Sequence, residues 1–322
     1  MADFKLTTPV VIIPFIRPEK TRRVFNEIKK ARPEKLFVLS DGGRNEAEWT
    51  KVRAIREMFD HEVDWPCEVF KRYPENNLGC KANIASGLYW VFEHVEDAII
   101  LEDDCVPDPT FFRFCQELLE KYRYDLRVTN INGTNLAVRD PKFKCDDSYY
   151  FGIIDATWGW ATWKRAWKHY DVDMKKWPQW KAEGLLKKVL NSDEYVDYYT
   201  YFFDQYHTGT IDAWPAQWLL ARWSLGSVAI NPANNLVTNI GFDRESSHGL
   251  YDPNDVRANI PTTPMKFPMK HPATIVANQE ADDFVFRYGV QINYYFKHKI
   301  MWLLRHHVPS FYKVLRKIKS FF

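Results

Sequence analysis

Three consecutive carboxylates follow a buried, strand-like segment of the chain. Residues 98–101 read AIIL, and Glu102, Asp103 and Asp104 come directly after them. Adjacent carboxylates repel one another unless a cation joins them, and a hard divalent ion combines one or two carboxylates with phosphate oxygens. The triplet therefore predicts a Mg²⁺ or Mn²⁺ site for a phosphate-bearing ligand. The alternative is an acidic turn facing water, but the apolar strand before the triplet favours the metal site.

The segments that must position this triplet alternate between strands and helices. Apolar runs predict strands and helical spacing predicts helices, in the order strand 9–16, helix 19–31, strand 36–39, helix 46–59, strand 68–73, helix 82–93, strand 98–101 and helix 109–124. This alternation indicates βαβ units and a mostly parallel, Rossmann-like sheet flanked by helices. Ligands bind beyond the carboxyl ends of the strands in such sheets, which is where the triplet lies.

Four stretches of the first half resemble GT-A glycosyltransferases. They read VVIIPFIRPEKTRRVF, FVLSDGG, NNLGCKANIASGL and IILEDDCVPDPTFFRFC. They are similar to N-acetylglucosaminyltransferase I and to family 2 bacterial glycosyltransferases over residues 9–120, and the likeness is patchy to residue 250. The resemblance implies an α/β fold of GT-A type. It also implies an inverting, metal-dependent transfer of a sugar from a nucleotide-diphosphate donor, preferably a UDP-sugar, to a hydroxyl of a glycan or lipid-linked acceptor.

The resemblance also assigns residues to the nucleotide. It implies that Asp104 ligates the metal that bridges the diphosphate, and that Glu102 and Asp103 face the sugar and the ribose. Arg17 would lie near the nucleotide, and Asp41 would accept from the uracil N3–H. From the residues alone, Arg17 and Asp41 are equally able to form surface ion pairs.

A turn at residues 76–79 leads into the third predicted helix. Gly79 lets the backbone approach a ligand, and Asn77 or Lys81 is within reach of a ribose or a phosphate. The segment resembles an Asn-x-Gly…Ala-x-Asn element of family 2 enzymes. The alternative is an ordinary turn followed by a helix start.

The region after residue 129 is rich in tryptophan, with short strands predicted at 149–153 and 227–231 and helices at 164–170, 185–190, 194–207 and 214–225. It contains the string DATWGWATW, which starts at Asp155. Small residues beside Trp158 and Trp160 leave aromatic faces that suit a sugar ring. We therefore expect Asp155, Trp158 and Trp160 at the acceptor site, and a Gly-Trp element of the resembled family indicates the same. Core packing is the alternative, and we expect it for most of the other tryptophans.

Two further residues are candidates for the chemistry. Asp212 precedes a predicted helix, where an Asp can simply cap it. The resemblance implies that Asp212 is the general base that takes the acceptor proton, with Asp155 and Asp204 as reserves. His248 lies in a polar segment where the resemblance implies a loop closing on the diphosphate. A neutral imidazole there can ligate the metal or donate to a phosphate, whereas an ordinary loop histidine does neither.

Composition limits the class of protein. The chain has 322 residues, 46% hydrophobic and 16% aromatic, which excludes a mainly disordered chain. Its five cysteines lack paired spacing, so we expect reduced thiols. Residues 1–8 lack a basic start and an apolar run, so we expect no signal peptide and a cytoplasmic protein. We expect a nucleotide-sugar-binding half at 1–128, an acceptor and catalytic half of the same domain at 129–259, and a wrapping loop with a basic amphipathic tail at 260–322.

Charge is unevenly distributed along the chain. Eight of the 44 Lys and Arg residues, and none of the 42 Asp and Glu residues, lie in 284–322, so this tail carries +8 and the rest of the chain −6. A basic amphipathic segment with Trp and Phe binds an anionic lipid surface, so we expect peripheral attachment to the inner face of the cell membrane. Packing on the acidic body, or a dimer contact, is the alternative. The acidic body argues against nucleic acid as a partner.

The function predicted from the sequence is thus a glycosyltransferase, and in a bacterium its expected product is a cell-surface polysaccharide. Two alternatives stay open. A sugar nucleotidyltransferase would use the same sheet, but it needs a glycine-rich loop after the first strand, where this chain has Phe15, Ile16, Arg17 and Pro18. A non-catalytic carbohydrate-binding or membrane scaffold protein would keep the fold without the reaction.

Overall fold

The apolar runs of the first half form the central strands of an eight-stranded sheet. In the computed structural model, which describes residues 4–243 and 255–289, β1 (Val10–Ile13) is buried throughout. It lies between β2 (Lys35–Leu39) and β4 (Asp97–Glu102), and β3 (Glu68–Arg72) follows β2 at the edge. These four strands are parallel to their neighbours, which confirms the predicted parallel βαβ half.

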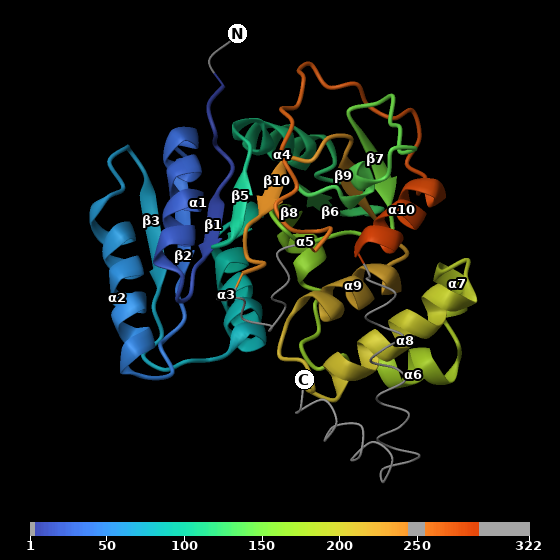
Figure 1. Cartoon of the computed structure of the whole chain (residues 1–322), viewed down its shortest axis with the longest axis horizontal. Helices are drawn as coiled ribbons and strands as arrows, with labels where there is room; N and C mark the ends of the chain where they lie inside the picture. Colours follow the sequence, from blue (N-terminus) through green and yellow to red (C-terminus); the bar gives the residue numbers. More distant parts are fainter. Residues whose placement is uncertain (1–3, 244–254, 290–322) are drawn as a thin grey trace, which may run out of the picture.

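Helices cover both faces of this half of the sheet, as its alternating side chains require. Val10 and Ile12 face a core shared with α1 (Pro18–Ala31), α2 (Glu46–His61) and α4 (Pro109–Lys121). Val11 and Ile13 face the opposite core, shared with α3 (Cys80–His94). The prediction of an α/β fold with a sheet flanked by helices is confirmed (Figure 1).

The second half makes the sheet mixed. Its strands are β6 (Val128–Asn132), β7 (Tyr149–Gly152), β8 (Trp160–Trp163) and β9 (Val228–Pro232). The sheet runs in the order β3-β2-β1-β4-β8-β6-β9-β7, and β8 is antiparallel to both β4 and β6. Outside this sheet, β5 (Cys105–Pro107) pairs with β10 (Val237–Asn239).

Most of the remaining helices pack on one another through a buried, aromatic-rich cluster. Besides a 3₁₀ helix at Leu136–Arg139, these helices are α5 (Lys164–Trp167), α6 (Trp177–Ala182), α7 (Leu186–Val189), α8 (Asp193–His207), α9 (Pro215–Ser224) and α10 (Gln279–Gly289). Trp177, Phe203, Trp223 and Phe286 belong to one buried cluster there. Figure 1 shows α6 to α9 grouped together below the second half of the sheet.

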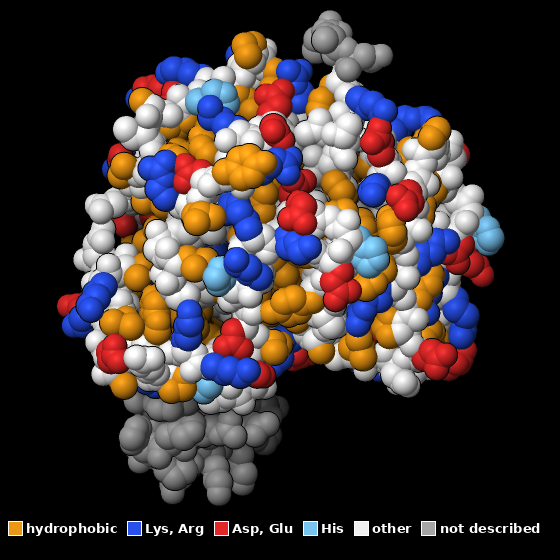
Figure 2. Space-filling model, turned by 180° about the vertical axis from the view of Figure 1, so that it is seen from behind, with side chains coloured by type: hydrophobic (Ala, Val, Ile, Leu, Met, Phe, Trp, Pro, Cys, Tyr) orange, Lys and Arg blue, Asp and Glu red, His pale blue; other side chains and the backbone are white. Residues whose placement is uncertain are grey.

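Two observations concern the surface. On the face seen in Figure 2, basic, acidic and hydrophobic side chains are interspersed. Within the described residues, every helix is too short or too polar to cross a membrane. The predicted basic tail lies almost entirely beyond residue 289, outside the described residues, so its proposed membrane contact stays a prediction.

Candidate functional site

The carboxyl ends of β1, β2 and β4 meet at one edge of the sheet. Ile13 of β1 lies opposite Glu102 of β4, so the loops after these strands leave the sheet side by side. Arg17 follows β1, Asp41 follows β2, and the acidic triplet begins at Glu102, the last residue of β4. The structure therefore gathers at one edge residues that are far apart in the sequence.

Arg17 is paired with two carboxylates of the triplet. Its Nη2 contacts Asp103 Oδ1, its Nε donates to Asp103 Oδ2 at 3.3 Å, and its Nη1 donates to Asp104 Oδ2 at 2.8 Å. The backbone N–H of Phe15 donates to Asp103 Oδ2 at 3.2 Å. Arg17 comes just before Pro18, the first residue of α1, so the helix start fixes the backbone from which the guanidinium reaches the triplet.

Burial changes the acidity of the triplet. It is the main cause of the raised pKa of Glu102, which Asp104 and Asp103 raise further, while Arg17 and the indole of Trp214 oppose the shift. Burial also raises the pKa of Asp103, against the opposing effect of Arg17. Glu102 therefore holds a proton more readily than an exposed glutamate, which lowers the negative charge of the triplet.

Asp41 organises the loop that contains Asn77. The backbone N–H groups of Leu78 and Gly79 donate to its two carboxylate oxygens at 2.9 and 3.1 Å. The Asn77 amide donates to the same carboxylate at 3.0 Å and to the carbonyl of Gly42 at 2.8 Å. Asp41 and Asn77 thus hold each other in place. The Asp41 carboxylate already accepts hydrogen bonds from this loop, so the predicted bond from a uracil N3–H would be an additional one.

Asp212 reaches the same edge from the second half of the chain. It is exposed, and a Cβ placed on Gly79 would lie 2.8 Å from its Oδ2. Cys80, which sequence reasoning missed, lies among these groups. Burial raises the pKa of its thiol, as do the charges of Glu102 and Asp212. The Asp212 carboxylate therefore lies close to the triplet. Lys81, another predicted ligand contact, follows Cys80 in the first turn of α3.

The segment after β10 covers the triplet from the other side. The N–H of Ile240 donates to the Asp104 carbonyl at 2.9 Å, and a Cβ on Gly241 would overlap the Asp104 carboxylate. Asp243 then pairs with Lys20 of α1 at 2.6 Å. His248 follows a few residues later but lies outside the described residues, so its predicted role stays a prediction.

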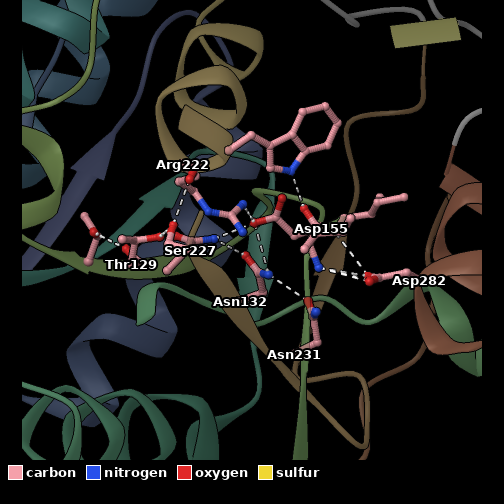
Figure 3. Close-up of polar contacts among 12 residues, drawn as sticks. Thr129, Asn132, Asp155, Arg222, Ser227, Asn231 and Asp282 are labelled. Carbon is pink, nitrogen blue, oxygen red and sulfur yellow. Dashed lines mark hydrogen bonds and ion pairs between the residues drawn. The ribbon is translucent and has the colours of Figure 1, made fainter. Parts of the chain in front are cut away.

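Asp155, expected at the acceptor site, lies in a buried polar network (Figure 3). Its side chain is 3% exposed and pairs with Arg222, which is fully buried, at 2.5 Å. Asn130 and Asn132 of β6 donate to the same oxygen at 2.6 and 3.3 Å. This carboxylate is committed to holding α9 against the sheet, so the structure lends no support to a direct acceptor contact.

The two tryptophans predicted for the acceptor site differ in placement. Trp160 is fully buried in β8, and its ring stacks on Trp214 with centroids 5.1 Å apart. A ring without exposed surface presents no face to a sugar, so its expected role is not supported. Trp158 is partly exposed and meets Phe242 edge-on at 5.5 Å. Of the pair, Trp158 alone stays available as an acceptor contact.

The carboxylates fit the predicted Mg²⁺ or Mn²⁺ in chemistry. Such ions need only one or two protein carboxylates when phosphate oxygens complete the coordination, and Asp104 is the carboxylate that would hold one. In this structure Arg17 occupies Asp104 Oδ2. Across residues 4–243 and 255–289, no group of three or more His, Cys, Asp or Glu side chains is arranged to hold a metal.

Comparisons with known proteins do not show the family of this chain. No protein-family model and no curated protein matches it. A UDP-glucose pyrophosphorylase solved with UDP-glucose aligns at 10% identity over 51% of this chain and 78% of that chain, with a TM-score of 0.28. A UDP-glucose pyrophosphorylase from Acinetobacter baumanii aligns at 11% identity over 51% and 77%, with a TM-score of 0.33. Similarity this low supports no argument about function, which has to come from the site.

Proposed function

We propose that this chain is a nucleotide-sugar-dependent transferase, and specifically a glycosyltransferase that uses a UDP-sugar. The supporting observation is that Arg17, Asp41 with the Asn77 loop, the triplet and Asp212 come from separate parts of the chain and meet at one sheet edge. A cation, several carboxylates and exposed backbone at the carboxyl ends of parallel strands suit a nucleotide diphosphate.

The proposed reaction assigns a separate task to each group. Asp212, exposed beside Gly79, takes the proton from the acceptor hydroxyl as that oxygen attacks the sugar. Asp104 would hold a divalent cation, which when bound neutralises charge on the leaving diphosphate. Arg17 can bind a phosphate oxygen through its fork of N–H donors. A base on one side and a diphosphate on the other favour inversion.

A sugar nucleotidyltransferase is the second candidate, and the position of Arg17 favours it. That enzyme needs a cation directly after the first strand to hold a triphosphate, and Arg17 is four residues beyond β1. The loop lacks the glycines that such a phosphate cradle uses, which argues for the glycosyltransferase. The two aligned pyrophosphorylases bear the name of the second activity, although their likeness is too low to decide.

Two measurements separate these candidates. Calorimetry with UDP, with and without Mn²⁺, is expected to show metal-dependent binding, and its absence would favour a non-catalytic scaffold. Incubation with a panel of UDP-sugars should release UDP, faster when a glycan or lipid-linked acceptor is present. Incubation with UTP and sugar 1-phosphates should not release pyrophosphate, and pyrophosphate release would establish the nucleotidyltransferase instead.

A further inference from the structure

The guanidinium of Arg17 lies where a cation shared by Asp103 and Asp104 would lie. Its three nitrogens all bond to these two carboxylates. The side chains are deeply placed, with 9% of Arg17, 2% of Asp103 and 14% of Asp104 exposed. A buried charge without a partner is costly, so a cation is needed here whether or not a metal is present.

Each oxygen of both carboxylates already has a contact. Asp103 accepts from Arg17 through both oxygens and also from the Phe15 N–H. Asp104 Oδ2 accepts from Arg17, and Asp104 Oδ1 faces the Cys105 thiol at 3.4 Å. The thiol is a weak donor, so the Arg17 bond is the strong contact that a metal ion at Asp104 would have to replace.

We propose that Arg17 occupies the cation position of the triplet, and that a divalent ion binds Asp104 only when the guanidinium moves from this carboxylate to a nucleotide phosphate. The exchange keeps every charge paired. Asp104 trades one cation for another, and Arg17 trades a carboxylate for a phosphate oxygen, which its fork also fits. Metal and nucleotide would then strengthen each other's binding, by the same factor in both directions.

This inference rests on the proposed function only for the identity of the nucleotide. The competition between Arg17 and a metal at Asp104 follows from the ion pairs alone and can be tested without a nucleotide. The probe is Mn²⁺ itself, whose free concentration is measured by electron paramagnetic resonance during titration of the full chain.

Arg17→Gln is expected to bind Mn²⁺ at least about tenfold more tightly than the unchanged chain when no nucleotide is present, since a like charge a few ångström away has been removed. The matched control is Arg22→Gln in α1, the helix that follows Arg17, where Arg22 pairs with the partly exposed Glu62. This control should bind Mn²⁺ like the unchanged chain. Equal or weaker Mn²⁺ binding by Arg17→Gln would overturn the proposal.

Adding UDP tests the exchange. UDP should tighten Mn²⁺ binding strongly in the unchanged chain and clearly less in Arg17→Gln, after Mn²⁺ binding to UDP in buffer is subtracted. An equal gain in both would overturn the proposed transfer of Arg17 to the phosphate. If UDP binds neither protein, the proposed function fails, while the nucleotide-free comparison still decides the competition at Asp104.

A second variant covers the possibility that Arg17→Gln does not fold. Arg17→Lys keeps the charge but loses the fork that spans both carboxylates. Its Mn²⁺ affinity should lie between those of the unchanged chain and Arg17→Gln, and Mn²⁺ should raise its melting temperature more than that of the unchanged chain. Arg17→Lys that binds Mn²⁺ no better than the unchanged chain would count against the proposal.

Discussion

At the scale of single residues, Asp212 is the side chain on which the proposed reaction depends most directly. It is exposed three residues before α9 begins, and its position beside Gly79 joins the second half of the chain to the nucleotide edge. The alternative that Asp212 caps α9 is not borne out, because Trp214 stands at the N-cap position and no side chain caps the helix there. A substitution that removes the charge of Asp212 but keeps its shape tests the proposed role.

Asp212→Asn should lower turnover by at least about a hundredfold, the usual contribution of a general base, and leave UDP affinity unchanged. Steady-state rates and calorimetry measure the two effects. Asp193→Asn is the control, because Asp193 is an exposed aspartate at the start of α8 that pairs only loosely with Lys187 at 3.2 Å. Near-normal turnover in Asp212→Asn would move the base elsewhere.

At the scale of elements, Gly79 determines how α3 approaches the site. Its φ of +83° with ψ of 161° is a backbone conformation that glycine alone adopts readily. A side chain there would also press on the Asp212 carboxylate, 2.8 Å from the added Cβ. The start of α3 can therefore lie close to Asp212 only if residue 79 has no side chain.

Gly79→Ala should cost about 1–3 kcal/mol of stability from backbone strain and should also weaken UDP binding. Gly184→Ala is a matched control, since Gly184 has a φ of +63° with no atom within 4 Å of an added Cβ. Urea unfolding and calorimetry are expected to show a stability loss in both variants and a loss of UDP affinity in Gly79→Ala alone. Unchanged UDP affinity in Gly79→Ala would separate Gly79 from the site.

Asp282 attaches α10 to the end of β7. Its carboxylate accepts from the N–H groups of Ile153 and Ile154 at 3.0 and 3.1 Å. Burial is the main reason that its pKa is raised to about 7, and the nearby Asp155 adds to the shift while Arg222 opposes it. Because the folded pKa exceeds the unfolded one, protonation of Asp282 stabilises the fold below about pH 4, and this contribution is lost as the pH rises to 7.

Asp282→Asn should remove this pH dependence. Relative to the unchanged chain, the variant should gain at most about 4 kcal/mol of unfolding free energy between pH 4 and pH 8. Urea unfolding across that range measures the difference, with Asp283→Asn, on the same helix, as the control. A constant difference between variant and unchanged chain would show that Asp282 does not titrate in this window.

The strands and helices differed in how well the sequence predicted them. β1, β2 and β4 were predicted because strands buried on both faces read as continuous apolar runs. β8 was missed because its sequence, Trp160 and Trp163 on either side of Ala161 and Thr162, was interpreted as an aromatic surface. β6 was missed because Asn130 and Asn132 make it polar. The buried Asp155 to which Asn130 donates can be identified only from the structure.

The residues of the site likewise include some that the sequence predicted and some whose roles it did not reveal. The triplet was found because it follows directly on a buried strand. Its pairing with Arg17, 86 residues away, could not be read from spacing. The role of Asp41 could not be predicted either, because it depends on backbone N–H groups of Leu78 and Gly79, which residue types do not reveal.

At the scale of the whole molecule, the charge asymmetry predicts how the chain meets a surface. Residues 284–322 carry +8 and the rest of the chain −6, so we expect the tail and not the body to be attracted to an anionic leaflet. Each basic residue near such a surface contributes about 1 kcal/mol, and apolar residues among them add insertion into the interface. Several such basic residues together would suffice for the predicted peripheral attachment, whereas the anionic surface would repel the acidic body.

Removing residues 297–322 should release the chain from vesicles that contain anionic lipid, as measured by co-sedimentation. A full-length variant with its seven Lys and Arg residues in 297–319 changed to Gln separates charge from apolar insertion. It should bind more weakly than the unchanged chain yet better than the truncated one, and raised salt should weaken only the unchanged chain markedly. If the truncated chain stays on the vesicles, the body makes the contact, and the tail is then better explained by packing on the acidic body or by dimerisation.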